Sequence, residues 1–290
     1  MNQKSMKKSN EHIPFVYFGT PDFSVDILRI MHDNDVTPDL VVTAPDKPRG
    51  RGQKVSAPPV GVWAKEHTIP FIQPEKITVD IIQEIADMAP AGGWELFVVV
   101  AYGHILPTDL IYSTNHNTLN LHPSLLPRLR GPAPIREAIL QENETGVSII
   151  ELDEKMDHGP IVAQQLVKMD EWPPAYPDLK KKLTETGANL LSRTIPDWVT
   201  GQIKALPQSH EDATYSRKFS SDDGKIDFDD SPNTNIRKIR AFTSWPKAHY
   251  IVDGNRVIIT KAHLSKGELV IDRVKPAGKE EMTYTEFTRT

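Results

Sequence analysis

The sequence predicts an α/β fold with a mostly parallel sheet, followed by a small β-rich domain. A strand, a helix and a second strand follow one another within residues 15–43, which is the order of a β–α–β unit. Residues 96–100 (LFVVV) are continuously apolar, as expected of a strand that is covered on both faces. After residue 200 the chain becomes polar and rich in turn residues, and short β-like segments dominate from Ile226.

The elements of the main sheet can be placed in order from apolar runs and helical periodicity. Strands are predicted at 15–18 and 40–43, and a helix at 23–32 joins them, with Thr20 or Asp22 as its expected cap. The later predictions are helices at 62–67, 77–88, 133–141 and 177–199, and strands at 69–72, 96–100, 118–122, 147–152 and 161–169. Ligands of such sheets bind beyond the carboxyl ends of the strands, which directs attention to the loops 19–22, 45–59, 101–107 and 123–131. The first of these loops (GTPD) lacks the glycine spacing of a dinucleotide site, so NAD is disfavoured.

Composition narrows the class of protein further. The 290 residues include no cysteine, which excludes disulfides, thiolate nucleophiles and cysteine-ligated metal sites. The net charge is −5, so any contact with nucleic acid has to come from a local basic patch. No apolar run of about 18 residues is present, and we expect a cytoplasmic protein without a membrane span. The predicted organisation is a disordered tail over 1–12, an α/β domain over 13–200, a linker over 201–224 and a β-rich domain over 225–290.

A basic stretch interrupts the regular pattern at residues 44–61 (APDKPRGRGQKVSAPPVG). It is rich in proline and glycine and has no apolar period, which predicts a long surface loop. Its cations suit the phosphates of a nucleic-acid backbone, although an ordinary solvated face would have the same composition. These cations are Lys47, Arg49, Arg51 and Lys54.

Two polar residues, Asn120 and His122, lie on one face at the end of the strand TLNLH, which stops at Pro123. An amide donates a hydrogen bond without carrying charge, and an imidazole donates or accepts near neutral pH. Together they suit the oxyanion that forms when a nucleophile attacks a carbonyl group. The alternative is that Asn120 caps a turn and His122 is a satisfied core histidine.

An acidic loop at residues 151–162 (ELDEKMDHGPIV) offers a third polar group. An aspartate beside a histidine raises the pKa of the imidazole or holds the ring in one tautomer. Asp153, Glu154 and Asp157 are all candidates, and their spacing does not decide among them. A solvated acidic turn between two strands is the other interpretation.

Six segments of the chain resemble the 10-formyltetrahydrofolate-dependent formyltransferase family, and the basic loop PDKPRGRGQK is similar to that of methionyl-tRNA formyltransferases. The segments occur in family order and cover residues 15 to about 230. They are FGTPDFS (18–24), APDKPRGRGQK (44–54), VVVAYGHILP (98–107), LNLHPSLLPRLRGPAPI (119–135), ETGVSIIELDEKMDHGPIV (144–162) and ATYSRKFSSDDGKIDF (213–228).

The resemblance implies a Rossmann-like formyltransferase domain and assigns roles to individual residues. It implies a catalytic triad of Asn120, His122 and Asp157, and direct attack of the methionyl α-amine of initiator tRNA on the formyl carbon, with no metal. Folate contacts are implied for Ala101, Tyr102, Gly103, Ile105, Leu106, Pro107, Ser124, Leu125, Leu126, Pro127 and Asp153. Contacts with tRNA are implied for Lys47, Arg49, Arg51 and Lys54. We expect a monomer.

The chain departs from the family pattern at its C-terminal end. The family has a larger barrel that resembles an oligonucleotide-binding fold, whereas here Ser265–Gly267 bridges the place of its middle strands, so a reduced, β-rich domain is expected. The short domain leaves a sugar-nucleotide N-formyltransferase with the same donor and triad as an alternative. A non-catalytic folate- or RNA-binding protein and a hydrolase of the donor are two further alternatives.

Overall fold

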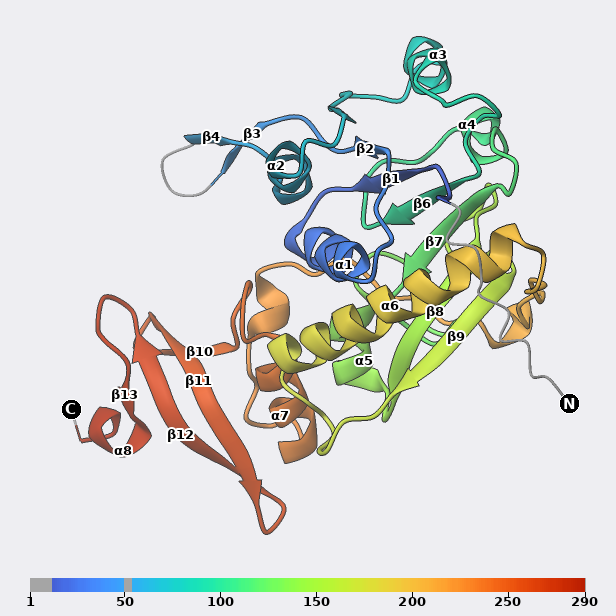
Figure 1. The fold of residues 1–290 in the computed structure, drawn as a ribbon. Coiled ribbons are helices and arrows are strands. Elements are labelled where there is room, and N and C mark those ends of the chain that lie inside the picture. Colours follow the sequence, from blue (N-terminus) through green and yellow to red (C-terminus); the bar gives the residue numbers. More distant parts are fainter. Residues whose placement is uncertain (1–11, 50–53, 290) are drawn as a thin grey trace, which may run out of the picture. The chain divides into compact units, whose positions relative to one another are not determined.

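A computed structural model describes residues 12–49 and 54–289 of the chain (Figure 1). The main sheet has seven strands in the order β5-β2-β1-β6-β7-β8-β9. Neighbouring strands from β5 to β7 are parallel, whereas β8 and β9 are antiparallel to each other, so the prediction of a mostly parallel sheet is confirmed. The strands are β1 (Phe15–Gly19), β2 (Leu40–Val42), β5 (Phe71–Ile72), β6 (Leu96–Val100), β7 (Thr118–His122), β8 (Thr145–Glu151) and β9 (Ile161–Val167).

The chain divides within β7 into two compact units. The first comprises the residues up to Asn120 together with Ser192–Lys204, and the second comprises Leu121–Leu191 and the chain from Ala205 onward. The longest described helix, α6 (Tyr176–Val199), contributes to both units. Within the described residues, no helix combines the length and the apolar content needed to cross a bilayer.

In the first unit, β1 pairs with β2 on one side and β6 on the other, which makes β1 the point at which the strand order reverses. The five residues of β1 and those of β6 are all buried, because both faces of these strands are covered. The helices are α1 (Asp22–Asp33), α2 (Pro59–Glu66), α3 (Val79–Asp87) and α4 (Thr108–Ile111). Val25, Leu28 and Met31 recur at three-residue spacing and form the buried face of α1.

The expected cap of α1 was wrong. The N-cap residue is Pro21, with no capping side chain, and its carbonyl accepts from the N–H groups of Ser24 and Val25. Thr20 instead donates its hydroxyl to the Tyr102 carbonyl at 3.1 Å and accepts from the Ala44 N–H at 3.3 Å. Thr20 therefore joins three loops that follow β1, β2 and β6, rather than closing a helix end.

The basic stretch is more regular than a surface loop. Lys47–Arg49 and Lys54–Ser56 form two short antiparallel strands, β3 and β4, with Lys47 opposite Ser56. Helix α2 then begins at Pro59, where a proline at the first helical position costs no hydrogen bond. The sequence pattern missed the hairpin because each strand has only three residues and contains no alternating apolar set.

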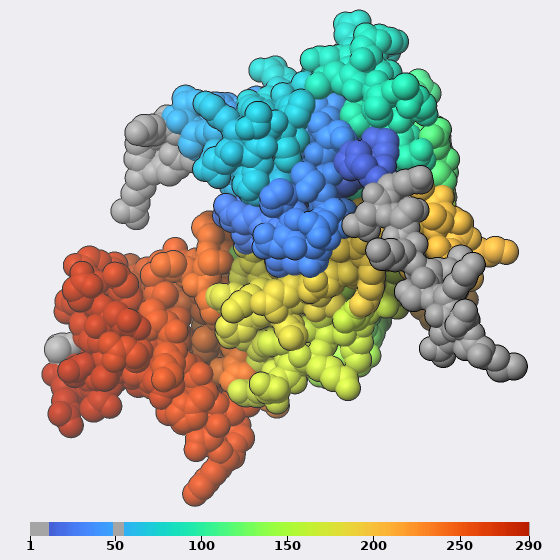
Figure 2. All heavy atoms as spheres, in the orientation of Figure 1, coloured from blue at the N-terminus to red at the C-terminus, as the bar shows by residue number. Residues whose placement is uncertain are grey.

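The second unit contains α5 (Pro134–Gln141), α7 (Pro232–Ala241), two 3₁₀ turns (η1, His210–Asp212, and η2, Asp222–Gly224) and a four-stranded antiparallel sheet. This sheet confirms the predicted β-rich domain, and its strands are drawn in orange and red in Figure 1, with their atoms in the same colours in Figure 2. Its elements are β10 (His249–Val252), β11 (Asn255–Ser265), β12 (Glu268–Pro276) and β13 (Met282–Thr283), followed by α8 (Tyr284–Phe287). Helix α7 was not predicted, although Ser231 caps it and a proline follows at the first helical position.

Candidate functional site

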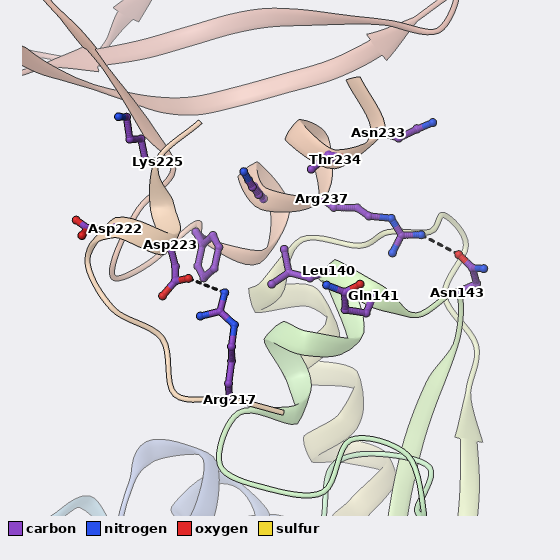
Figure 3. Close-up of a pocket in the computed structure, with 12 residues that line it drawn as sticks. Leu140, Gln141, Asn143, Arg217, Asp222, Asp223, Lys225, Asn233, Thr234 and Arg237 are labelled. Atoms are coloured by element: carbon purple, nitrogen blue, oxygen red, sulfur yellow. Dashed lines mark hydrogen bonds and ion pairs between the residues drawn. The ribbon is translucent and has the colours of Figure 1, made fainter. Parts of the chain in front are cut away.

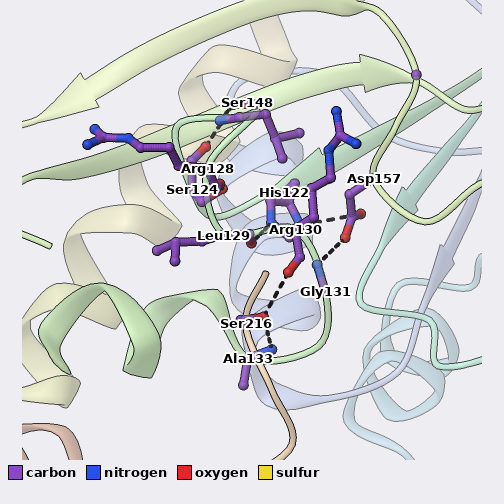
Figure 4. Close-up of polar contacts among 12 residues, drawn as sticks. His122, Ser124, Arg128, Leu129, Arg130, Gly131, Ala133, Ser148, Asp157 and Ser216 are labelled. Carbon is purple, nitrogen blue, oxygen red and sulfur yellow. Dashed lines mark hydrogen bonds and ion pairs between the residues drawn. The ribbon is translucent and has the colours of Figure 1, made fainter. Parts of the chain in front are cut away.

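The imidazole of His122 and the carboxylate of Asp157 face each other in the second unit (Figure 4). His122 ends β7, and Asp157 lies in the loop between β8 and β9. His122 Nδ1 lies 3.4 Å from Asp157 Oδ1, and the two side chains are only 6% and 13% exposed. At this burial, solvent screens the charge of the carboxylate far less than at a surface.

The second nitrogen of His122 is held by the backbone. Its Nε2 lies 2.9 Å from the Leu129 carbonyl oxygen, which can only accept, so Nε2 carries a proton. The Nδ1 lone pair of the neutral ring then points at the Asp157 carboxylate, and neither group can donate to the other. A proton that arrives between them is bonded on both sides, and the resulting imidazolium is stabilised at both nitrogens. The pair is therefore built to accept one proton as a unit.

Both partners of His122, Leu129 and Asp157, have strained backbone conformations. Leu129 and Asp157 have φ values of +61° and +50°, the left-handed region that costs a leucine about 1–2 kcal/mol. This conformation turns the Leu129 carbonyl toward His122. The carboxylate of Asp157 is fixed as well, because its Oδ2 accepts from the Gly131 N–H at 2.7 Å. Gly131 has a φ of +106°, and a Cβ there would lie 2.8 Å from the Ser216 carbonyl oxygen, so only glycine fits.

Asn120 belongs to the same strand as His122, two residues earlier, and both residues are largely buried. Alternate residues of a strand share a face, so the amide and the imidazole are on the same face of β7. Of the three acids considered in the acidic loop, Asp157 lies within ion-pair distance of His122. Asp153 instead pairs with His158, with Oδ2 2.6 Å from Nδ1, and Glu154 is exposed.

The loop after β6 (101–107) lies at the carboxyl end of that strand in the first unit. Ala101 and Gly103 have positive φ values, +50° and +90°. Ile105 is 90% exposed, whereas the neighbouring Leu106 is buried and Pro107 caps α4. Burial raises the pKa of the Tyr102 hydroxyl to about 12, and this hydroxyl has no hydrogen-bond partner within the described residues.

The turn after His122 is hydrogen-bonded to side chains of β8 and β9. Ser124 is buried and donates to the Arg128 carbonyl at 2.7 Å. The Leu126 N–H donates to Ser148 Oγ, and its carbonyl accepts from Gln164, so both backbone groups are used. Leu125 is half-buried, and the bond between Leu126 and Pro127 is cis. This segment offers a fixed backbone surface rather than free side chains.

The basic residues of the hairpin are only partly described. Lys47 is exposed in β3. Arg49 and Lys54 face each other across the hairpin by backbone register. Arg51 lies outside the described residues.

A cavity of about 620 Å³ in the second unit lies between α5, α7 and the segment 217–225 (Figure 3). Several of its charged residues already have protein partners. The Arg217 guanidinium, 2.6 Å from the Asp223 carboxylate, lowers the pKa of that carboxyl through their hydrogen bond. Arg237 donates to the carbonyls of Ile139 and Glu142, and to the Asn143 side chain. The bonds of Arg237 thus join α7 to the end of α5, and neither His122 nor Asp157 lines this cavity.

Sequence reasoning missed several residues that shape the site, including Arg130, Gln208, Thr214 and Ser216. Arg130 and Gln208 are polar yet buried, and Thr214 and Ser216 bond the backbone of residues 129–133. All but Arg130 lie in a stretch whose composition indicates a linker. No local pattern marks contacts between residues about 80 positions apart.

Comparisons with known proteins agree with this architecture. The family model described as "Formyl transferase" matches residues 12–195, and the model "Formyl transferase, C-terminal domain" matches residues 218–268. A methionyl-tRNA formyltransferase from a Sulfurihydrogenibium species is 41% identical over 237 residues, covering 81% of this chain and 75% of that protein. One from Geobacillus thermodenitrificans is 36% identical over 301 residues, covering 94% of this chain and 93% of that protein.

Solved structures share the fold at much lower identity. An N-formyltransferase from Helicobacter canadensis, in complex with folinic acid and dTDP-3-aminofucose, has a TM-score of 0.65 at 19% identity, over 87% of this chain and 88% of that chain. A methionyl-tRNA formyltransferase from Clostridium thermocellum has a TM-score of 0.60 at 14% identity, over 91% of this chain and 98% of that chain. At such identities the likeness concerns the fold alone.

Proposed function

Because the chain belongs to the formyl transferase family, and within it to the methionyl-tRNA formyltransferases, we propose that it formylates the α-amine of methionyl initiator tRNA. The formyl donor is 10-formyltetrahydrofolate. The observation that carries the proposal is the buried His122–Asp157 pair at the end of β7, next to Asn120 in the same strand. It provides a proton acceptor and an amide donor for attack on a carbonyl carbon.

The side chains divide the work of the reaction. The methionyl amine attacks the formyl carbon, a new C–N bond forms, and negative charge develops on the formyl oxygen. Asn120 donates to that oxygen, since the Nε2 proton of His122 is committed to the Leu129 carbonyl. The amine proton passes to the His122–Asp157 pair. When the bond between the formyl carbon and the donor nitrogen breaks, the proton passes on to that nitrogen.

The remaining contacts follow from position. We place the folate against the Ala101–Pro107 loop and the turn Ser124–Pro127, with Asp153 as a further contact. The exposed Ile105 and the unpaired Tyr102 hydroxyl support the first of these. Lys47, Arg49, Arg51 and Lys54 would meet the acceptor end of the tRNA as phosphate contacts. We further propose a cytoplasmic monomer with a catalytic domain over 13–200, a linker over 201–224 and a reduced β-rich domain over 225–290.

The test is an acceptor assay with labelled 10-formyltetrahydrofolate. Charged initiator methionyl-tRNA, charged elongator methionyl-tRNA and an amino-sugar nucleotide are offered in parallel to the full chain. We expect label on the initiator tRNA and a loss of about 10²–10⁴-fold in His122→Asn, which removes the proton acceptor. Faster labelling of the amino sugar than of the tRNA, or no transfer to either, would contradict the proposal.

A further inference from the structure

Residues 206–216, which lie in the stretch between the main domain and the C-terminal sheet, bind the backbone on both sides of the His122–Asp157 pair. We refer to them as the strap. At one end, Leu206 and Ile161 exchange two backbone hydrogen bonds of 2.8 Å, which fixes the strap to the start of β9. At the other end, the Arg130 N–H donates to the Thr214 carbonyl and the Ser216 N–H donates to the Arg130 carbonyl, at 2.9 and 2.7 Å.

The strap reaches His122 through Leu129. The Thr214 hydroxyl accepts from the Leu129 N–H at 2.9 Å, so it fixes the strained residue whose carbonyl holds His122 Nε2. Ser216 Oγ also lies 3.1 Å from the Arg130 carbonyl and accepts from the Ala133 N–H (Figure 4). Three backbone N–H groups and one carbonyl between Leu129 and Ala133 are therefore bonded to the strap.

The strap reaches Asp157 through Gln208, which is 6% exposed. Gln208 Nε2 donates to the Asp157 carbonyl at 3.0 Å and to the Gly159 carbonyl at 2.7 Å. These two bonds clamp the turn in which Asp157 has its positive φ. A glycine is needed beside the clamp, because a Cβ at Gly159 would lie 1.8 Å from the Glu151 carbonyl oxygen.

The Gln208 side chain also links the segment that contains Arg130 to the loop that contains Asp157. Gln208 Oε1 accepts from Arg130 Nη2 at 2.7 Å and from Arg130 Nε at 3.2 Å. Arg130 is 2% exposed, and no carboxylate of the described residues lies within ion-pair distance of it. A buried guanidinium without an anion is costly unless neutral acceptors meet its N–H groups.

His210 is the second neutral acceptor of Arg130. Its Nδ1 lies 2.9 Å from Arg130 Nη2, and because a guanidinium only donates, Nδ1 must be unprotonated. Desolvation, and then the charges of His158 and Arg130, lower the pKa of His210, in keeping with a neutral ring. Gln208 thus accepts from the buried Arg130 guanidinium through its oxygen and donates to the carbonyls of Asp157 and Gly159 through its nitrogen.

We propose that Gln208 is a positioning residue for formyl transfer, which acts by fixing Asp157 against His122. The inference deepens the proposed function and rests on it. A shift of the carboxylate by about 1 Å would cost on the order of 10²-fold in kcat. Substrate binding is expected to change little, because among the described residues the Gln208 side chain bonds Arg130 and the carbonyls of Asp157 and Gly159.

The test compares Gln208→Met, Gln208→Glu and the control Gln202→Met in the full chain. Methionine keeps the length and removes every hydrogen bond, whereas glutamate keeps the acceptor for Arg130 and loses the donor to Asp157 and Gly159. Gln202 is exposed, and its side chain donates to Thr200 Oγ1 at 2.8 Å, away from the strap. We expect kcat to fall about 10–100-fold in both Gln208 variants, with KM for methionyl-tRNA within about threefold, and no change in the control.

A double-mutant cycle with Asp157→Asn separates positioning from general stability. If Gln208 acts through Asp157, Gln208→Met costs less than about threefold once Asp157 has been replaced. The Gly131 amide, bonded to Asp157 Oδ2, should also exchange its hydrogen faster in Gln208→Met. Additive losses in the cycle, or unchanged kcat in both Gln208 variants, would overturn the inference. An inactive wild-type chain would instead remove the proposed function, and the exchange of Gly131 would still report on the clamp.

Discussion

Replacing Asp157 with asparagine isolates its charge from its structural role. Asparagine adopts a positive φ readily, and its carbonyl oxygen can still accept from the Gly131 N–H at the place of Oδ2. The negative charge beside His122 Nδ1 is lost, and the Nδ2 amide that replaces Oδ1 can donate to the Nδ1 lone pair, so the substitution also occupies the proton-accepting site. A charged hydrogen bond becomes a neutral one, so we expect the free energy of unfolding to fall by about 1 kcal/mol.

The effect on the rate follows from the distance between the two groups. Two unit charges 3.4 Å apart attract by on the order of 5 kcal/mol at an effective dielectric constant of about 20. The imidazolium loses an attraction of this order, which corresponds to between about 10³- and 10⁴-fold in kcat. Removal of a positioned acid–base group costs a similar factor, roughly 10²–10⁴-fold.

The assay is single-turnover formylation with enzyme in excess over charged initiator tRNA, so that product release does not limit the rate. Glu154→Gln is the matched control, because it removes a charge from the same loop at an exposed position. We expect the control to stay within about twofold of wild type. If Asp157→Asn retains more than a tenth of the wild-type rate, the proton-accepting pair derived from the geometry is incorrect.

Three further outcomes are expected. Glu137 is buried in α5, its Oε2 is unpaired within the described residues, and burial raises its pKa. Ionisation of this carboxyl therefore opposes folding at pH 7, and the cost disappears below the ordinary pKa of a glutamate. Glu137→Gln should raise the melting temperature at pH 8 and have little effect at pH 4, and equal melting temperatures at pH 8 would contradict this. Gly159→Ala places a Cβ against the Glu151 carbonyl and should lower both the melting temperature and kcat, with Gly254→Ala, where a Cβ meets no neighbouring atom, as the control for activity. Lys47→Ala should raise KM for tRNA and lower the salt dependence of binding by about one phosphate contact, and an unchanged slope of affinity against salt would remove Lys47 from the tRNA contacts.

The sequence predicted elements well where one physical signal dominated. Strand β6 is apolar on both faces, and β7 ends at a proline, so both were placed correctly. Helix α3 lies within the predicted helix at 77–88, but of its three isoleucines only Ile85 is buried. Helix α7 was missed because only Ile236 and Ile239 mark its apolar side, among charged and polar residues.

Some residues of the candidate site could be predicted from the sequence, and others could not. Asn120 and His122 were found because two polar residues on one face of a buried strand conflict with the local apolar pattern. Thr20 was one of two residues expected to cap a helix, whereas its hydroxyl joins the loops after β2 and β6, more than 20 and 80 residues away. A capping residue and a loop-bridging residue have the same local sequence, so only the tertiary structure distinguishes them.

The polar composition of residues 206–216 explains why a linker was predicted there. Glutamine, histidine, threonine and serine are typical of solvated connections, but here they face a buried arginine and strained carbonyl groups. Backbone in the left-handed region cannot use the hydrogen bonds of a helix or a sheet, so its polar groups need side-chain partners from elsewhere. The strap provides these partners for Leu129 and Asp157 together. The partners of His122 are therefore held by side chains more than 80 residues further along the chain than His122, in a segment whose composition alone indicates no function.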